Sequence, residues 1–245
     1  NNSNDLELTI CLAKILDNMP WVRTVFVVTQ RPQVPDCASM SDKIKVIHHD
    51  DIGIQTPVFN SVAIESHLHN IPGLTEHFIY FNDDIFVTRP VYPYQFFTSC
   101  GKPILHLGSI QTKNKKGNKL YFKSYNHMLQ EVRYHPTHSI SFVYRPDHMM
   151  MAMTKRLMTA TEQTYSTVWN RARSAIFRDA TPPPLSLAAT YGLSVQTAVV
   201  AVKGGSNDLV SKYSNIPLMN PWKYDAICVN DSTVTIQQRL YEQLM

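Results

Sequence analysis

The clearest pattern along the chain is an alternation between helical and strand-like spacing of hydrophobic residues. Apolar side chains recur at helical spacing from Leu8 to Met19, and Pro20 predicts the end of this helix. Residues 22–29 are mostly apolar and β-branched, which is typical of a strand packed on both faces. Residues 44–47 predict a short second strand.

The same alternation continues in the next segment. Asn60 is typical of a helix N-cap, and the apolar positions after it predict a helix that ends at Pro72. On this helix Glu65 and His69 fall one turn apart on the same face. A strand is expected to begin at Phe78. Helices alternating with strands predict an α/β fold with a largely parallel sheet.

The second half of the chain has a weaker pattern. Residues 111–123 are rich in lysine without an apolar period, which predicts a mobile loop. A helix is expected from Pro146 through the methionine-rich stretch, and another from the proline run at 182–184 to Val200. A strand at 226–229 is expected to lead into a last helix.

Two predicted strands end in carboxylates, and this is the most informative chemical feature. The run 78–81 leads into Asn82, Asp83 and Asp84, and the run 226–229 leads into Asp231. Ligands of open α/β sheets bind outside the carboxyl ends of the strands. Adjacent carboxylates suit a hard divalent cation that shares its other positions with phosphate oxygens. The alternatives are an ordinary acidic turn for the pair and a helix N-cap for Asp231.

Three further side chains are candidates for chemistry, although each has an ordinary interpretation. Glu65 could act as a base, or it could lie on a solvated helix face. His138 lies in a predicted loop, and histidine is a residue type that often serves as a general base. Arg178 could bind phosphate through its planar guanidinium group. Taken singly, the ordinary interpretation of each residue is favoured.

Composition narrows the class of protein. With 245 residues, 44% of them hydrophobic, the chain can form one large core, and we expect a single domain over residues 1–245. A net charge of +4 does not indicate a nucleic-acid binder. No apolar run approaches the length of a membrane span and the first residues show no signal pattern, so we expect a soluble, cytoplasmic protein without a membrane span.

Several of these motifs, taken in order, resemble the second conserved region of the Stealth family. This family comprises sugar-1-phosphate transferases, among them bacterial capsule polymerases and the animal N-acetylglucosamine-1-phosphotransferase. The resemblance covers about residues 1–97. It rests on Leu6 to Asn18, Pro20 to Thr29, Phe59-Asn60-Ser61, Ala63 to His67 and Phe78 to Asp84. The segments around His138, Phe177-Arg178-Asp179 and Ile227 to Asp231 resemble later family regions in the same order.

The resemblance implies a glycosyltransferase-A-like α/β fold, with a mixed, mostly parallel sheet and helices on both faces. It implies a UDP-sugar donor, a glycan or polysaccharide acceptor, and transfer of sugar 1-phosphate with release of UMP. Asp83, Asp84 and Asp231 are then expected to hold Mg²⁺ or Mn²⁺. Arg178 would bind the phosphates, and Glu65 or His138 would take the acceptor proton. Residues of about 125–245 would form the acceptor side and close the domain.

Two other functions fit the same residues. An ordinary glycosyltransferase on this scaffold would use the same carboxylates and metal but attack the anomeric carbon and release UDP. A glycan-binding module that had lost catalysis is a third reading, which the joint presence of the candidate residues argues against. The family's first region has no counterpart before Asn1, so either the chain begins after it or the donor is bound differently. Residues 92–133 have no clear family counterpart, which leaves the choice of acceptor open.

Overall fold

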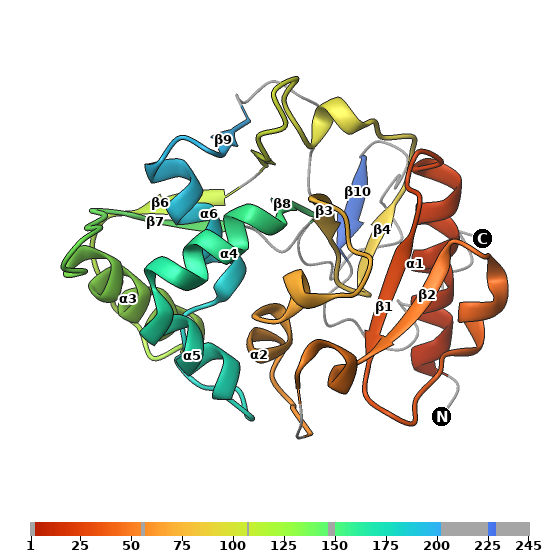
Figure 1. The fold of residues 1–245 in the computed structure, drawn as a ribbon, viewed down its shortest axis with the longest axis horizontal. Coiled ribbons are helices and arrows are strands. Elements are labelled where there is room, and N and C mark those ends of the chain that lie inside the picture. The colour runs from red at the N-terminus through yellow and green to blue at the C-terminus, as the bar shows by residue number, and fades with distance from the viewer. Residues whose placement is uncertain (1–2, 55–56, 107, 147–149, 202–224, 229–245) are drawn as a thin grey trace.

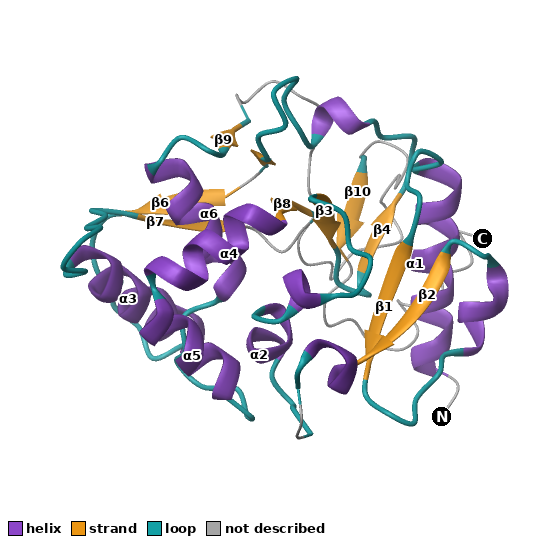
Figure 2. Ribbon diagram, in the orientation of Figure 1, coloured by secondary structure: helices purple, strands orange, loops and turns teal. Residues whose placement is uncertain are grey.

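A computed structural model describes residues 3–54, 57–106, 108–146, 150–201 and 225–228. Helices and strands are mixed along the chain, as expected for an α/β protein (Figures 1 and 2). Helix α1 (Ser3–Asn18) lies on one side of the molecule with strands β1 (Val25–Thr29) and β2 (Ile44–His48). The opposite side is built from helices α3 (Leu120–Arg133), α4 (Lys155–Thr164), α5 (Ser166–Ser174) and α6 (Pro184–Ser194).

Four strands lie between these two sides in Figure 1: β3 (His77–Tyr80), β4 (Ile85–Val87), β8 (Met151–Thr154) and β10 (Ala226–Cys228). The shorter strands are β5 (Ile104–Leu105), β6 (Gly108–Gln111), β7 (Val143–Pro146) and β9 (Val199–Val200). Single helical turns are η1 (Asp36–Met40), η2 (His49–Ile52), η3 (Leu68–Asn70) and η4 (Pro93–Gln95), and the short helix α2 spans Ser61–Glu65.

The pairing of the described strands differs from the expected, mostly parallel sheet. β1 pairs with β2 in parallel, from Val25 opposite Ile44 to Thr29 opposite His48, and β5 pairs with β9 in parallel. β3 with β8, β4 with β10 and β6 with β7 are antiparallel. The prediction of a mostly parallel sheet is therefore wrong for these pairs, because β3 and β4 both take partners from the second half of the chain.

The described part of the methionine-rich stretch contains a strand, β8, whereas its composition predicted a helix. β7 ends at Pro146, all four residues of β8 are buried, and the helix α4 begins only at Lys155. The Thr154 side chain accepts a hydrogen bond from the Leu157 amide and caps this helix. A short apolar run without a helical period can be a strand buried on both faces, and tertiary packing here overrides the helix propensity of methionine.

Two more boundaries differ from the expected ones. The lysine-rich segment is helical from Leu120, so the irregular part of it is shorter than the predicted loop at 111–123. The predicted helix from the proline run to Val200 ends at Ser194, and β9 follows at Val199. Gln196, with φ of +57°, adopts a backbone conformation that cannot continue a right-handed helix.

The helix predicted after Asn60 is broken after Glu65. The Ser66 hydroxyl donates to the Ala63 carbonyl at 2.7 Å, and the His67 Nδ1 lies 2.9 Å from the same oxygen. Side chains that bond to a nearby backbone carbonyl compete with the next helical hydrogen bond. The chain therefore turns into η3, and Glu65 and His69 are not neighbours on one continuous helix face.

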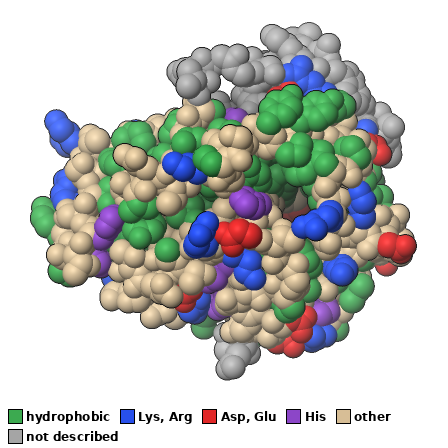
Figure 3. All heavy atoms as spheres, turned by 45° about the horizontal axis from the view of Figure 1, so that its top comes forward, with side chains coloured by type: hydrophobic (Ala, Val, Ile, Leu, Met, Phe, Trp, Pro, Cys, Tyr) green, Lys and Arg blue, Asp and Glu red, His purple; other side chains and the backbone are tan. Residues whose placement is uncertain are grey.

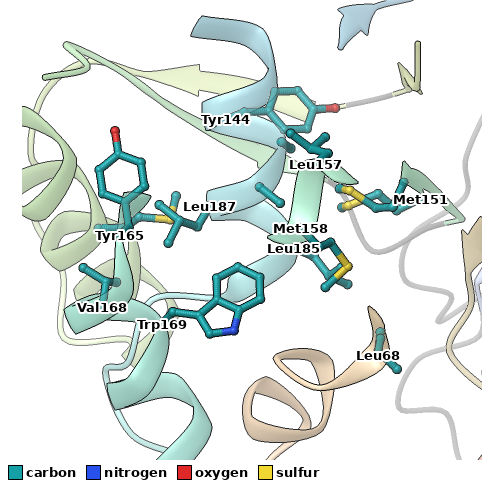
Figure 4. Packing of buried hydrophobic residues seen from close by; sticks show 14 of the residues in the cluster. Leu68, Tyr144, Met151, Leu157, Met158, Tyr165, Val168, Trp169, Leu185 and Leu187 are labelled. Carbon is teal, nitrogen blue, oxygen red and sulfur yellow. The ribbon is translucent and has the colours of Figure 1, made fainter. Parts of the chain in front are cut away.

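Two hydrophobic clusters hold the central strands in place. In the larger one, Trp169 of α5, Met158 of α4 and Leu185 of α6 pack together, and Leu68 of η3 reaches toward them (Figure 4). In the other, α1 packs on β4, with Ile15 and Cys11 against Phe86 and its neighbours. Burial of large apolar side chains on both sides fixes the start of β4, and thereby the residues just before it.

The predicted packing of β1 on both faces is confirmed, with the qualification that each of its residues keeps some exposure. Phe26 and Val28 pack on the larger cluster, whereas Val25 and Val27 pack on a small cluster formed with α1 and η1. Within the described ranges, no helix combines the length and the apolar character that crossing a bilayer requires.

Candidate active site

The two adjacent aspartates lie in the turn between two central strands. β3 ends at Tyr80 and β4 begins at Ile85, so Asp83 and Asp84 occupy the short link between them. The Ile85 amide donates to the Asn82 carbonyl at 3.3 Å and closes this turn. Asp83 is exposed and Asp84 is half-buried. The predicted strand that delivers carboxylates to its end is thus confirmed for this pair.

Two buried thiols lie beside the aspartate turn. Cys228 of β10 is paired with Ile85, and its Sγ donates to Asp84 Oδ2 at 3.5 Å. The Cys11 Sγ of α1 donates to the Ile85 carbonyl at 3.2 Å. Burial, together with the charge of Asp84, raises the pKa of both thiols to about 12. Both thiols therefore stay protonated at neutral pH and act here as hydrogen-bond donors.

Glu65 is the last residue of α2, and its carboxyl group is half-buried. Burial raises the pKa of this carboxyl to about 7, although the Tyr80 hydroxyl and the charge of Arg178 act in the opposite direction. The Tyr80 Oη lies 3.4 Å from Glu65 Oε1 and also donates to the Asn82 side chain. A carboxyl group poised near neutral pH in this way is typical of a general base.

Tyr80 connects Glu65 to the aspartate turn. Burial raises the pKa of its hydroxyl well above the usual value, and the charges of Glu65, Asp83 and Asp84 add to this effect. All three carboxylates therefore lie within electrostatic reach of one phenol. The structure thus brings together Glu65, Asp83 and Asp84, which the sequence placed on two separate elements.

Arg178 is held near Glu65 by a contact between two distant segments. The Asn60 side chain, which is 2% exposed, donates to the carbonyls of Ala175 and Phe177 at 3.2 and 3.1 Å. The Phe59 amide donates to the Ile176 carbonyl at 2.9 Å. The exposed Arg178 follows directly, and its charge acts on Glu65. An exposed cation therefore lies within electrostatic reach of Glu65 and is accessible to an anionic ligand.

His138 makes its described contacts with a different set of residues, in the loop between α3 and β7. Its Nε2 lies 3.1 Å from the Ser194 Oγ, and its carbonyl accepts a hydrogen bond of 2.7 Å from the Tyr165 hydroxyl. Its ring packs edge-on against Tyr191 at 5.0 Å between centroids. The neighbouring His135 and Tyr165 line a pocket between the end of α3 and the junction of α4 and α5.

The expected metal ligands are only partly covered by the structure. Asp231 lies outside the described residues. Within the described ranges, no group of three or more His, Cys, Asp and Glu side chains is close enough to hold a metal ion. Asp83 and Asp84 nevertheless supply carboxylate oxygens from one turn, the donor atoms that Mg²⁺ and Mn²⁺ prefer. The turn therefore fits as part of such a site.

The expectation that His69 would accompany Glu65 is wrong. The His69 Nε2 lies 2.8 Å from Glu162 Oε2, and the other carboxylate oxygen of Glu162 binds Arg173 Nη1 at 2.6 Å. The backbone turn at Ser66 separates the two side chains. Glu65 faces the aspartate turn and His69 faces α4 and α5.

Sequence reasoning missed Tyr80, Asn82 and Cys228 as members of the site. Tyr80 was included in an apolar strand and Cys228 was taken as a core thiol. The alternation of side chains along a strand could have identified Tyr80, because residues 80 and 82 face the same side at the strand end. The contact between Cys228 and Asp84 has no such signal, because 144 residues separate them.

Comparison with known proteins gives the same assignment for the first part of the chain. Residues 2–105 match the family model described as Stealth protein CR2, conserved region 2. The chain is 44% identical over 119 residues to the capsular polysaccharide phosphotransferase LcbA of Aeromonas hydrophila, covering 47% of this chain and 33% of that protein. It is 43% identical over 122 residues to a capsular polysaccharide phosphotransferase of Neisseria meningitidis serogroup B, covering 48% of this chain and 31% of that protein.

A third relative is similar over more of the chain. The exopolysaccharide phosphotransferase cps2G of Lactiplantibacillus plantarum is 29% identical over 256 residues, which cover 89% of this chain and 74% of that protein. The chain spans only about a third of the length of the other two relatives. The match to conserved region 2 of the Stealth family covers residues 2–105, the part of the chain that carries Glu65, Asp83 and Asp84.

Proposed function

We propose that this chain carries the active site of a transferase that moves sugar 1-phosphate from a nucleotide sugar to a glycan hydroxyl. The donor would be a UDP-sugar, and the nucleotide released would be UMP. The observation that carries the proposal is the cluster in which Tyr80 connects Glu65 to Asp83 and Asp84, with the charge of Arg178 acting on Glu65. The polysaccharide phosphotransferases among its relatives support this class of reaction.

Glu65 is the proposed general base. It would take the proton from the acceptor hydroxyl as that oxygen attacks the β-phosphorus of the donor. A pKa of about 7 allows the carboxylate to be ionised at neutral pH and still basic enough to accept the proton. His138 is the other candidate for this step, but its described contacts are with Ser194, Tyr165 and Tyr191, which favours Glu65.

Arg178 is proposed to bind the phosphate oxygens of the donor. Its guanidinium group is exposed and always charged, and its backbone is fixed by the bonds from Asn60 to the preceding segment. Negative charge moves to the leaving phosphate as the bond to the β-phosphorus breaks. A fixed cation beside that oxygen stabilises the transition state more than the ground state.

Asp83 and Asp84, with Asp231 as a third ligand, would hold Mg²⁺ or Mn²⁺ in this proposal. The ion, when bound, supplies positive charge that neutralises the diphosphate. The chain's own contribution is to hold Asp84 in place through the Cys228 thiol and the pairing of β4 with β10. The two carboxylates would then reach one ion with little reorganisation.

The acceptor would be a glycan or polysaccharide. One face of the molecule is hollowed near its middle, with hydrophobic side chains gathered on one border and Lys, Arg, His and acidic side chains beside it (Figure 3). Carbohydrate ligands present both apolar C–H faces and many hydroxyl groups, and a surface of mixed character suits both.

The single domain over residues 1–245 remains a prediction.

The experiment that tests this function identifies the nucleotide product. The wild-type protein is incubated with Mn²⁺, a panel of UDP-sugars and a mixed pool of glycan acceptors, with Asp84→Asn as the control. UMP release with an acceptor-dependent phosphodiester is the expected result. UDP release with a new glycosidic bond would replace the proposal by an ordinary glycosyltransferase. Glycan binding without either product would indicate a binding module.

A further inference from the structure

A pair of exposed aromatic rings lies beside the proposed active site and has no part in the chemistry described above. Phe59 and Phe177 stack with a centroid distance of 5.7 Å and an angle of 11° between their planes. The two residues remain 64% and 67% exposed. Because each ring covers part of the other and both stay mostly exposed, the pair presents a flat apolar surface to solvent. This pair is called the aromatic ledge below.

The backbone beneath the aromatic ledge is fixed. Asn60 follows Phe59 and caps α2, and its buried side chain bonds to the carbonyls on either side of Ile176. The Phe59 amide bonds to Ile176 itself. Two segments more than 100 residues apart in sequence are thereby held in register. Two large apolar rings on such a fixed backbone are typical of a binding surface. Because this backbone is already ordered in the free protein, ligand binding does not have to offset the entropy cost of ordering it.

The aromatic ledge is close to the proposed base and phosphate-binding group. Phe59 directly precedes Asn60, the N-cap of α2, and about 8 Å separate Asn60 from Glu65, the last residue of the helix, at about 1.5 Å per residue. Arg178 follows Phe177 directly in the chain. A ligand that covers the rings therefore lies within the length of a short oligosaccharide from both groups.

We propose that the aromatic ledge binds a sugar ring of the acceptor glycan and thereby brings its hydroxyl to Glu65. The negative face of an aromatic ring attracts the C–H bonds that line one face of a pyranose. The inference rests on the proposed function. Position favours the acceptor: Arg178, which follows Phe177 directly, is proposed to hold the donor phosphates that the acceptor hydroxyl attacks, so a sugar ring on the aromatic ledge lies beside the reacting groups.

The nucleobase of the donor is the main competing occupant, because bases also stack on aromatic rings. In a UDP-sugar, however, the ribose and one phosphate separate the base from the β-phosphorus. The acceptor's sugar ring carries the attacking hydroxyl itself, so it must lie next to Glu65. The aromatic ledge lies within the length of the short helix α2 from Glu65, and this short distance favours the acceptor ring over the more remote base.

The test uses Phe59→Ala and Phe177→Ala, with Tyr94→Ala as the matched control. Tyr94 is 70% exposed and also stacks on a neighbour, Tyr92, at 5.7 Å, but it lies on η4 away from α2. In steady-state assays with the acceptor varied, each Phe variant should raise the KM for acceptor about tenfold. The kcat and the KM for the UDP-sugar should stay unchanged, and Tyr94→Ala should match the wild type.

A binding measurement separates this inference from the proposed function. Phosphodiester-linked capsule oligosaccharides, uncharged dextran oligosaccharides and UMP are offered to the proteins without a second substrate, with NMR saturation transfer as the readout. Oligosaccharide binding that is lost in both Phe variants and kept in Tyr94→Ala supports the inference, even if the wild type transfers nothing. The inference is overturned by wild-type protein that binds no oligosaccharide, by loss of UMP binding instead, or by active Phe variants with an unchanged KM for acceptor.

Discussion

Glu65 and Glu162 lie on opposite sides of the turn at Ser66, and they differ in their hydrogen-bond partners and in the direction in which their pKa values are shifted. Glu162 is bound by His69 at 2.8 Å and by Arg173 at 2.6 Å. Among the described contacts, the Glu65 carboxyl group accepts one long hydrogen bond, 3.4 Å from the Tyr80 hydroxyl. Burial acts to raise the pKa of both carboxyl groups. In Glu162 the hydrogen bonds from Arg173 and His69 outweigh it and the pKa is lowered, whereas in Glu65 burial prevails and the pKa rises to about 7.

The difference shows how the same residue type serves structure in one place and chemistry in the other. Glu162 connects α4 to α5 and η3, and the same network reaches the Ser66 carbonyl through Trp169 and Arg173. Its charge is satisfied within the protein and cannot take up a proton at neutral pH. Glu65 keeps an incomplete set of partners and faces the aspartate turn, which leaves it free to exchange a proton with a substrate.

The largest effect is expected from Asp84→Asn, which removes a charge from the proposed metal and phosphate site. We expect a loss of about a thousandfold in kcat, since such charge stabilisation is worth several kcal/mol. The melting temperature should change little, because the amide can still accept from Cys228. Asp17→Asn, on an exposed position of α1, is the matched control. Full activity in Asp84→Asn would remove this residue from the site.

Glu65→Gln should lower kcat by about a hundredfold or more, the usual contribution of a general base. It should not destabilise the protein. A carboxyl group whose pKa is raised on folding makes the folded state less stable as pH rises from about 4.5 to about 7. At pH 8 the Gln variant should therefore be more stable than the wild type by about 1–2 kcal/mol, after allowing for its half-exposed position.

The check for Glu65→Gln is urea unfolding at pH 5 and pH 8 beside a kinetic assay. An equal stability difference at both pH values would show that the pKa of Glu65 is not raised. A variant that is stabilised at pH 8 and still fully active would confirm that the pKa of Glu65 is raised, but it would contradict the role of Glu65 as the general base.

Glu162→Gln should have the opposite pattern. The change leaves the half-buried Arg173 without its carboxylate, so we expect a loss of about 2 kcal/mol in the free energy of unfolding. The pKa of Glu162 is lowered on folding, so its contribution is present above about pH 4.5 and is lost as pH falls through the folded value. The turnover per folded molecule should stay within twofold of the wild type. A large loss of turnover at unchanged stability would contradict the structural role.

Asn60→Ala should have a smaller effect on both properties. The side chain caps α2 by accepting from the Val62 amide at 3.2 Å, and it holds the segment before Arg178. We expect a loss of about 1–2 kcal/mol in stability and about tenfold in kcat, because Arg178 is no longer held near Glu65. Asn60→Asp keeps the cap but loses the two donors, so it should recover stability more than activity. Equal recovery of both would argue against a role in positioning Arg178.

Structural features that depend on neighbouring residues in the sequence could be predicted, whereas features that depend on contacts between distant segments could not. α1, β1 and β2 follow from the spacing of apolar residues, and the aspartate turn from carboxylates that directly follow a strand. The break at Ser66 was missed because the side chains of Ser66 and His67 both bond to the Ala63 carbonyl and compete with the next helical hydrogen bond. The spacing of apolar residues gives no sign of this competition. β8 was missed because its partner, β3, is remote in sequence.

The candidate site was predictable in its members more than in its arrangement. Glu65, Asp83 and Asp84 were all identified, but their connection through Tyr80 is a tertiary contact. The bonds from Asn60 to residues 115 and 117 positions away have no local signal in the sequence. The ion pair between His69 and Glu162, which are 93 residues apart, also has no local signal in the sequence. Because His69 binds Glu162, the prediction that it lies beside Glu65 was wrong.

The most direct test of the contrast between the two glutamates is a ¹³C NMR titration of the carboxyl carbons. Selective labelling of glutamate, with Glu65→Gln and Glu162→Gln used to assign the two signals, gives both pKa values in one protein. We expect a midpoint near 7 for Glu65 and a midpoint below the usual glutamate value for Glu162. A midpoint for Glu65 at or below the usual value would contradict its role as the base.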